Sequence, residues 1–159
     1  MSQAIGLAVA LCITFLAATA GGIASVNAGS FYAQLVKPAW APPGWLFGPV
    51  WSALYILMAF AAWLVWRAAG LPQAKRALLL FAAQLVANAL WSWLFFAWRL
   101  GASAFADVVA LWILVAATLM SFWRVQRLAA VLLAPYLAWI TFAAVLTLAV
   151  WRRNPQLLG

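Results

Sequence analysis

Residues 31–51 read FYAQLVKPAWAPPGWLFGPVW, and this stretch separates the first apolar run of the chain from the later ones. Prolines at positions 38, 42, 43 and 49 alternate with aromatic rings at positions 40, 45, 47 and 51. Proline fixes φ and removes a backbone donor, so the segment is stiff and cannot pair as a β-sheet. An interfacial aromatic belt would have a similar composition. The proline spacing favours a structured cap at the membrane surface over a belt alone.

The chain is strongly apolar on both sides of this stretch. Of its 159 residues 70% are hydrophobic and only 6% are charged, and the mean hydropathy is +1.09. A soluble domain is about 25% charged. Since so few ionised groups cannot cover a surface in water, we expect an integral, multi-pass membrane protein whose solvent is the lipid bilayer.

The charged residues exclude several kinds of site. The chain has nine Lys or Arg, one acidic residue (Asp107) and no His. Without His the commonest metal ligand and general base is missing, and one carboxylate cannot form a multi-carboxylate pump. We therefore expect no metal site and no obligatory cofactor. The cations are scattered between apolar runs, which predicts anchors at the membrane ends and no nucleic-acid partner.

A helix needs about 20 apolar residues to cross a bilayer, and the chain offers five such runs. The sequence predicts an all-α bundle of five transmembrane helices in one domain, residues 1–159, with helices at about 3–25, 45–67, 76–98, 103–124 and 128–152. The long loop at 26–44 is expected to be structured and functional. Ala18-Thr19-Ala20 has the form of a signal-peptide cleavage site, but no cation precedes position 37, so we expect the first span to be retained.

Helical spacing places aromatic and polar side chains on common faces of three spans. Residues three or four positions apart share a face, which gives stripes in the third span (Gln84, Asn88, Trp91, Phe95), the second (Trp51, Tyr55, Met58, Ala62) and the fifth (Tyr136, Trp139, Ala143, Leu146). Such stripes suit a cavity for a flat, largely apolar ligand. Packing between helices is the alternative for each stripe.

Several motifs together resemble one family. The run YxxxxKPxWxPPxW begins at Tyr32 and is continued by GPVW at 48–51; AQLVANALW at 83–91, PYLAW at 135–139 and VWRRN at 150–154 follow in order. This series resembles the TspO/MBR family of tryptophan-rich sensory proteins and translocator proteins. The resemblance implies a five-helix bundle, often a homodimer, with a ligand cavity beneath the first loop.

The resemblance also implies a function. Family members are linked to porphyrin-type tetrapyrroles and to benzodiazepine or isoquinoline-type drugs, so we expect a membrane binding protein that acts as a translocator or sensor of porphyrins. Light-dependent degradation of porphyrin, with Trp51 and Trp139 as the reacting residues, is the alternative. Because a chain without His offers no imidazole for haem iron, the expected ligand is a metal-free, protoporphyrin-type molecule.

The expected ligand contacts come from the loop and three spans: Tyr32, Trp40, Trp51, Tyr55, Gln84, Asn88, Trp91, Phe95, Trp139, Ala143 and Leu146. Trp51 and Trp139 match family positions associated with the tetrapyrrole pocket. The loop cation Lys37 is expected to meet a propionate of the ligand. For Gln84 and Asn88, ligand contact and helix packing are equal alternatives.

Three smaller expectations concern particular residues. Mitochondrial relatives have a tyrosine in a proposed cholesterol motif where this chain has Leu148, which argues against sterol binding and for a bacterial member. Ser103 is expected to cap the fourth helix, where the helix dipole would favour Asp107. Ala83 and Ala87 have the spacing of a helix-packing face and are the expected contact of a homodimer.

Overall fold

The computed structural model describes residues 3–159, and no strand occurs within this range. Its helices are α1 (Gln3–Ala24), α2 (Ala28–Gln34), η1 (Gly44–Leu46), α3 (Phe47–Ser92), η2 (Trp93–Ala97), α4 (Gly101–Val125) and α5 (Arg127–Arg153). Four helical stretches are long and apolar enough to cross a membrane. The predicted all-α, multi-pass membrane fold is therefore confirmed.

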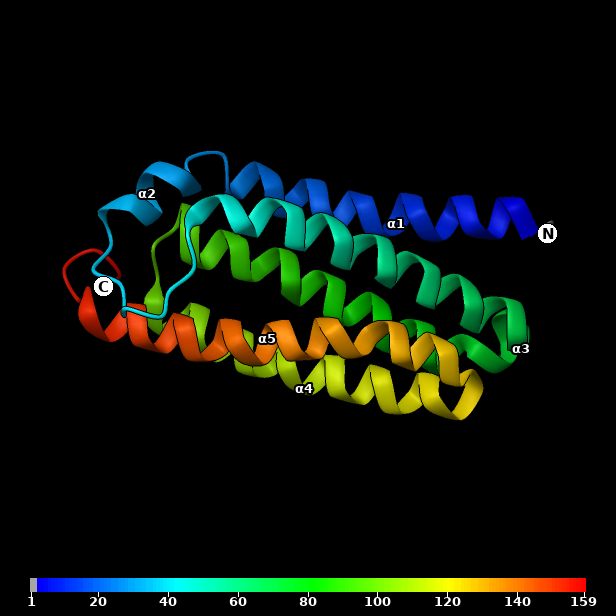
Figure 1. Ribbon diagram of the computed structural model, residues 1–159. Helices are drawn as coiled ribbons and strands as arrows, with labels where there is room; N and C mark the ends of the chain where they lie inside the picture. The colour runs from blue at the N-terminus through cyan, green and yellow to red at the C-terminus, as the bar shows by residue number, and fades with distance from the viewer. Residues whose placement is uncertain (1–2) are drawn as a thin grey trace.

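The longest of these helices is a hairpin. At Gly70 the backbone has φ 67° and ψ 173°, which is not helical, and in Figure 1 the α3 ribbon runs to one end of the bundle and returns. The first half (47–69) and the second half (71–92) correspond to the second and third predicted spans. The predicted loop at 68–75 is instead helical on both sides of Gly70, since Pro72 is tolerated in a first helical turn.

Gly70 carries the first testable prediction. Its dihedral angles lie in a region that residues with a Cβ avoid, although a Cβ there would make only ordinary contacts, the nearest at 3.8 Å. We expect Gly70→Ala to lower the free energy of unfolding by about 1–2 kcal/mol through backbone strain. Denaturant titration in detergent micelles measures this, with the exposed Leu71→Ala as control. Equal stability of the two variants would contradict the strained turn.

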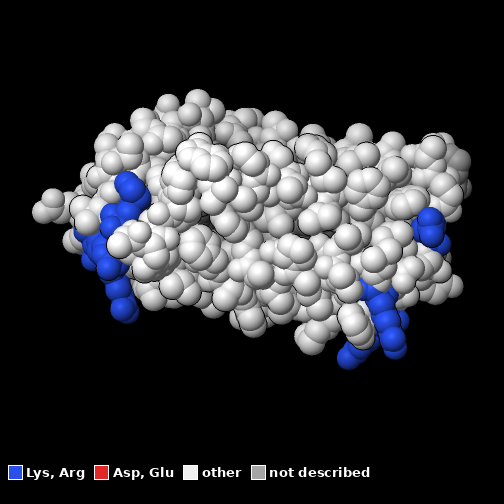
Figure 2. Space-filling view, viewed as in Figure 1, with Lys and Arg blue, Asp and Glu red and all other residues white. Residues whose placement is uncertain are grey.

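The α3 hairpin forms the middle of the bundle. α1 lies along one side of it and α4 with α5 along the other (Figure 1). The buried core between these layers includes large side chains such as Met58, Leu111, Phe122 and Tyr136. Lys and Arg side chains gather at the two ends of the bundle and leave an uncharged band between them (Figure 2). This arrangement agrees with the prediction that the cations anchor the ends of the membrane-spanning helices.

The start of α4 differs from the expectation. The helix begins at Gly101 and follows Leu100, so Ser103 does not cap it. Gly101 is buried because the Trp151 ring lies directly against it, and its N–H donates to the carbonyl oxygen of Leu158 at 2.8 Å. The C-terminal residues thus fix the start of this helix, which no local capping signal at Ser103 could reveal. Asp107, one turn after Ser103, has a buried Oδ2 without a hydrogen-bond partner.

Candidate functional site

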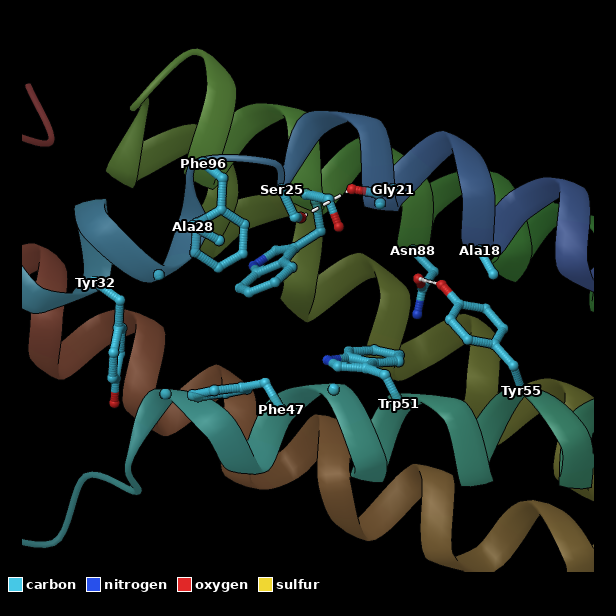
Figure 3. Close-up of a pocket in the computed structure, with 16 residues that line it drawn as sticks. Ala18, Gly21, Ser25, Ala28, Tyr32, Phe47, Trp51, Tyr55, Asn88 and Phe96 are labelled. Atoms are coloured by element: carbon cyan, nitrogen blue, oxygen red, sulfur yellow. Dashed lines mark hydrogen bonds between the residues drawn. The ribbon is translucent and has the colours of Figure 1, made fainter.

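A cavity of about 340 Å³ lies at the loop end of the bundle, between α1, α2 and the two halves of α3 (Figure 3). This volume is at the lower end of the range for small-molecule sites, roughly 300–1,000 Å³. The lining residues are Ala18, Gly21, Gly22, Ser25, Ala28, Gly29, Tyr32, Gly44, Phe47, Gly48, Trp51, Tyr55, Asn88, Trp91, Ser92 and Phe96. None of them comes from α4 or α5.

Aromatic rings form two walls of this cavity. Phe47, Trp51 and Tyr55 follow one another at intervals of four residues, so they share a face of the first half of α3. On the other wall the rings of Trp91 and Phe96 meet edge to face, with centroids 5.6 Å apart. Residues five positions apart do not lie on the same face of an α-helix. The π-helix η2 adds a residue to the turn, so Phe96 lies on the same side as Trp91.

A buried polar network lies at the inner end of the cavity. The Tyr55 hydroxyl donates to Oδ1 of Asn88 at 2.7 Å, as Figure 3 shows, and Nδ2 of Asn88 donates to the Tyr136 hydroxyl at 2.7 Å. All three side chains are buried. The network therefore joins both halves of α3 to α5, and Asn88 has a packing role as well as a place on the cavity wall.

Small residues form the side of the cavity that faces α1 and α2. A Cβ on Gly21 would lie 3.1 Å from Oγ of Ser92, so α1 rests directly on the second half of α3 at this point. Gly22, Gly29 and Gly48 also line the cavity, but a Cβ on any of them would meet nothing within 4 Å. At these three positions, therefore, no close contact with another part of the chain requires glycine.

Hydrogen bonds stiffen the loop between α2 and η1, which lies at the same end of the bundle as the cavity (Figure 1). The Tyr32 hydroxyl donates to the carbonyl oxygen of Pro42 at 2.9 Å. Nζ of Lys37 donates to the carbonyl oxygens of Tyr32 and Leu35, at 2.7 and 3.0 Å, and lies 4.8 Å from the Tyr32 ring centroid. Lys37 thereby satisfies carbonyls at the end of α2. Burial raises the pKa of the Tyr32 hydroxyl above its ordinary value, so the hydroxyl stays protonated further into the alkaline range.

Asn154 fastens this loop to the end of α5. Its Oδ1 accepts from the Val36 N–H at 2.8 Å, while its Nδ2 donates to the carbonyl oxygens of Val36 at 3.0 Å and Val150 at 2.7 Å. The side chain is only 5% exposed. Residues 118 positions apart are thus held together by one amide, which we call the Asn154 clasp.

Removal of the clasp is expected to loosen the loop locally. In Asn154→Leu the three hydrogen bonds are lost, each worth about 1 kcal/mol, so amide exchange at Val36 should accelerate by roughly ten- to a hundredfold. Hydrogen–deuterium exchange with peptide mass spectrometry measures this. Gln156→Leu, at an exposed position in the same tail, serves as the control. Unchanged exchange at Val36 would show that the clasp does not hold the loop.

With this geometry established, comparison with known proteins identifies the family. A profile of the TspO/MBR family matches residues 8–152. The chain belongs to the TspO/MBR family. A tryptophan-rich protein TspO from Chlorobaculum tepidum is 38% identical over 156 residues, covering 94% of this chain and 97% of the relative. A tryptophan-rich sensory protein from Cereibacter sphaeroides is 42% identical over 149 residues, covering 91% and 92%.

The similarity extends to animal members of the family. A translocator protein from Sus scrofa is 42% identical over 126 residues, which cover 78% of this chain and 75% of that protein. The resemblance drawn from the sequence motifs is confirmed. The names of these TspO/MBR relatives describe sensory and translocator proteins in general terms.

Five of the residues expected to contact a ligand line the cavity of this TspO/MBR protein: Tyr32, Trp51, Tyr55, Asn88 and Trp91. The expected ligand contacts did not include Phe47 or Phe96, nor the small residues of α1 and α2. Phe47 lies one turn before Trp51 on the same stripe, and this spacing was the available signal. Glycine and alanine give no comparable signal, because they are common on helix-packing faces.

The other expected contacts lie outside the cavity lining. Trp139 lies behind Phe47, with ring centroids 5.8 Å apart, and Trp40 is half exposed and packs edge-on against Phe142. The remaining four are buried: Gln84, Phe95, Ala143 and Leu146. Contact of these residues with a ligand stays a prediction, as does the meeting of Lys37 with a propionate.

Gln84 illustrates the packing alternative. Its Nε2 lies 3.8 Å from Sδ of Met58, whereas its Oε1 is buried without a hydrogen-bond partner. The side chain is 1% exposed and lies one turn from Asn88. The homodimer contact at Ala83 and Ala87 also stays a prediction; Ala83 is exposed on the second half of α3.

Proposed function

We propose that this TspO/MBR protein binds porphyrin-type tetrapyrroles in the membrane and acts as their translocator or sensor. The observation that carries the proposal is the cavity between two aromatic walls, one with Phe47, Trp51 and Tyr55 and the other with Trp91 and Phe96. Aromatic rings on opposite sides suit a flat ligand that is held by stacking. Drugs of the benzodiazepine or isoquinoline type are flat and apolar as well and are expected to compete for the same space.

The chemistry of the lining supports a metal-free porphyrin. It contains no charged residue and no sulfur atom, and its polar groups are the hydroxyls of Ser25, Tyr32, Tyr55 and Ser92, the amide of Asn88 and the indole N–H groups of Trp51 and Trp91. The chain has no His. Apolar stacking with a few hydrogen-bonding groups is the usual basis of such a site. Of the side chains that ligate haem iron, the lining holds only Tyr32 and Tyr55, and their hydroxyls donate to Pro42 and Asn88.

A tryptophan-fluorescence titration in lipid nanodiscs tests the proposal. Protoporphyrin should quench the wild type saturably, and Trp51→Phe should weaken the apparent affinity about three- to tenfold, because ring stacking contributes roughly 0.5–1.5 kcal/mol. Trp139→Phe should have a smaller effect, since that ring lies behind Phe47. Trp123→Phe, at an exposed position on α4, corrects for the loss of one fluorophore. Linear quenching without saturation would indicate partitioning into lipid and contradict the proposal.

Light-dependent breakdown of bound porphyrin is the alternative function. Trp51 lines the cavity, but Trp139 does not, so only one of the two indoles expected to react is on the cavity wall. We therefore favour binding over turnover. Illumination of the complex distinguishes the two: new absorbing products that disappear in Trp51→Phe would establish the enzyme, whereas a constant porphyrin spectrum would support the binding protein.

A further inference from the structure

The cavity is open on one side, and the lining residues exposed there are all glycines. Of the sixteen residues drawn in Figure 3, Gly22, Gly29, Gly44 and Gly48 are exposed and the others are buried or partly buried. Gly22 and Gly29 belong to α1 and α2, and the other two to η1 and the first turn of α3. We call the opening between these two pairs the glycine slit.

At the loop end of the bundle the cavity is bordered by Tyr32, whose hydroxyl is bonded to the fastened loop. A route over this end would have to displace the loop from the Asn154 clasp and from the bond between Tyr32 and Pro42. Lys37 adds two bonds within the same loop. The glycine slit requires no such displacement, since a Cβ on Gly22, Gly29 or Gly48 meets only open space.

The surroundings of the slit are those of a lipid-facing surface. Ile23, Val26 and Trp45 lie next to or near the slit residues in the chain and are 60%, 77% and 72% exposed. None of the cavity-lining residues is charged, and the Lys and Arg side chains gather at the ends of the bundle (Figure 2). Exposed aliphatic side chains beside a tryptophan are typical of the boundary between acyl chains and headgroups.

We propose that ligands enter and leave this cavity sideways from the lipid leaflet at the loop end of the bundle, through the glycine slit. The absence of side chains at Gly22, Gly29 and Gly48 leaves open space at these three positions of the slit. The identity of the ligand rests on the proposed function, whereas the exposure of the slit to lipid does not. A ligand dissolved in the bilayer would thus reach the aromatic walls while the loop remains fastened.

Spin-label accessibility tests the slit without any ligand. Gly29→Cys and Gly48→Cys, each in a Cys12→Ser background, receive a nitroxide in nanodiscs, and its collisions with oxygen and with a water-soluble nickel chelate are compared. Oxygen concentrates in lipid and the chelate in water. Ile113→Cys on α4 and Gln156→Cys in the tail provide the lipid-facing and water-facing controls. We expect both slit labels to resemble the Ile113 label; labels that resemble the one at Gln156 would overturn the proposal.

Association kinetics then test the route. The rate of protoporphyrin binding should follow its mole fraction in the lipid, and Asn154→Leu, which unfastens the loop, should leave that rate unchanged. A rate that follows the aqueous concentration, or one several-fold faster in Asn154→Leu, would overturn lateral entry. If protoporphyrin does not bind saturably, the proposed function fails, and the spin-label comparison alone then decides whether the slit opens to lipid.

Discussion

Gly48→Phe should abolish porphyrin binding and leave the fold intact. Gly48 lies in the first turn of α3, lines the cavity and has nothing within 4 Å of the position that a Cβ would take. A phenyl group can therefore be added without a clash at its Cβ, and since Gly48 lines the cavity we expect the ring to fill space between the aromatic walls. We expect the affinity for protoporphyrin to fall at least about a hundredfold, or roughly 2.7 kcal/mol, in a fluorescence titration in nanodiscs.

The matched control for this variant is Ala53→Phe. Ala53 is exposed on the same half of α3 but does not line the cavity, so the same ring is added outside the site. It should bind protoporphyrin like the wild type, and both variants should keep the wild-type thermal midpoint. Wild-type affinity in Gly48→Phe would show that the ligand lies elsewhere. A lowered midpoint in that variant alone would show that the position is packed and not open.

The second large effect is expected on stability. Asn88→Leu keeps the approximate volume of the side chain but removes the acceptor of the Tyr55 hydroxyl and the donor to the Tyr136 hydroxyl. Each of these buried groups then lacks its partner, at a cost of about 1–2 kcal/mol. We expect the free energy of unfolding to fall by about 2–4 kcal/mol in denaturant titrations in detergent micelles.

Two further variants separate this network from general packing. Tyr55→Phe removes one hydrogen bond and leaves the one between Asn88 and Tyr136, so it should cost about half as much as Asn88→Leu. Asn27→Leu changes an exposed asparagine outside the bundle core and should have little effect. If Asn88→Leu is as stable as the wild type, the two hydroxyls find other partners and the network does not hold α3 to α5.

Much of the architecture could be predicted from the sequence, because bilayer thickness limits the possible lengths of the apolar runs. The charge-free runs gave the five spans, and the prolines between 38 and 49 gave the structured loop. The ends were less accurate. Arg67 and Arg76 were predicted to end their spans, with Lys75 in the loop between them, yet all three lie on helix on either side of Gly70. Their long side chains can extend from a helix end to the membrane surface, so a charge does not mark the end of a span.

The candidate site was predicted only in part, for a different reason. Helical periodicity shows which residues share a face but not which neighbour covers that face. Trp51 and Asn88 line the cavity as expected, whereas Tyr136 is fully buried in the core and Trp139 packs behind Phe47. The same limit applies to Phe96, because the π-helix changes the spacing on which the stripe in the third span was based.

Contacts between distant segments could not be predicted from the sequence at all. Asn154 was noticed only as the last letter of a motif, and its bonds to Val36 span most of the chain. Glycines raise a similar difficulty. Gly21 is needed for the close approach of α1 to Ser92, whereas Gly22 beside it faces open space. Nothing in the amino-acid sequence distinguishes these two glycines. The three-dimensional arrangement was required to separate packing glycines from those of the slit.

Photo-cross-linking in nanodiscs tests the location of the ligand most directly. A protoporphyrin that carries a diazirine is bound, illuminated at the diazirine wavelength, and its adducts are mapped by peptide mass spectrometry, with unlabelled protoporphyrin as competitor. The cavity predicts competable adducts in residues 18–32, 44–55 and 88–96, the segments that supply its lining. Competable adducts confined to α4 and α5, residues 101–153, would contradict a site between α1, α2 and α3.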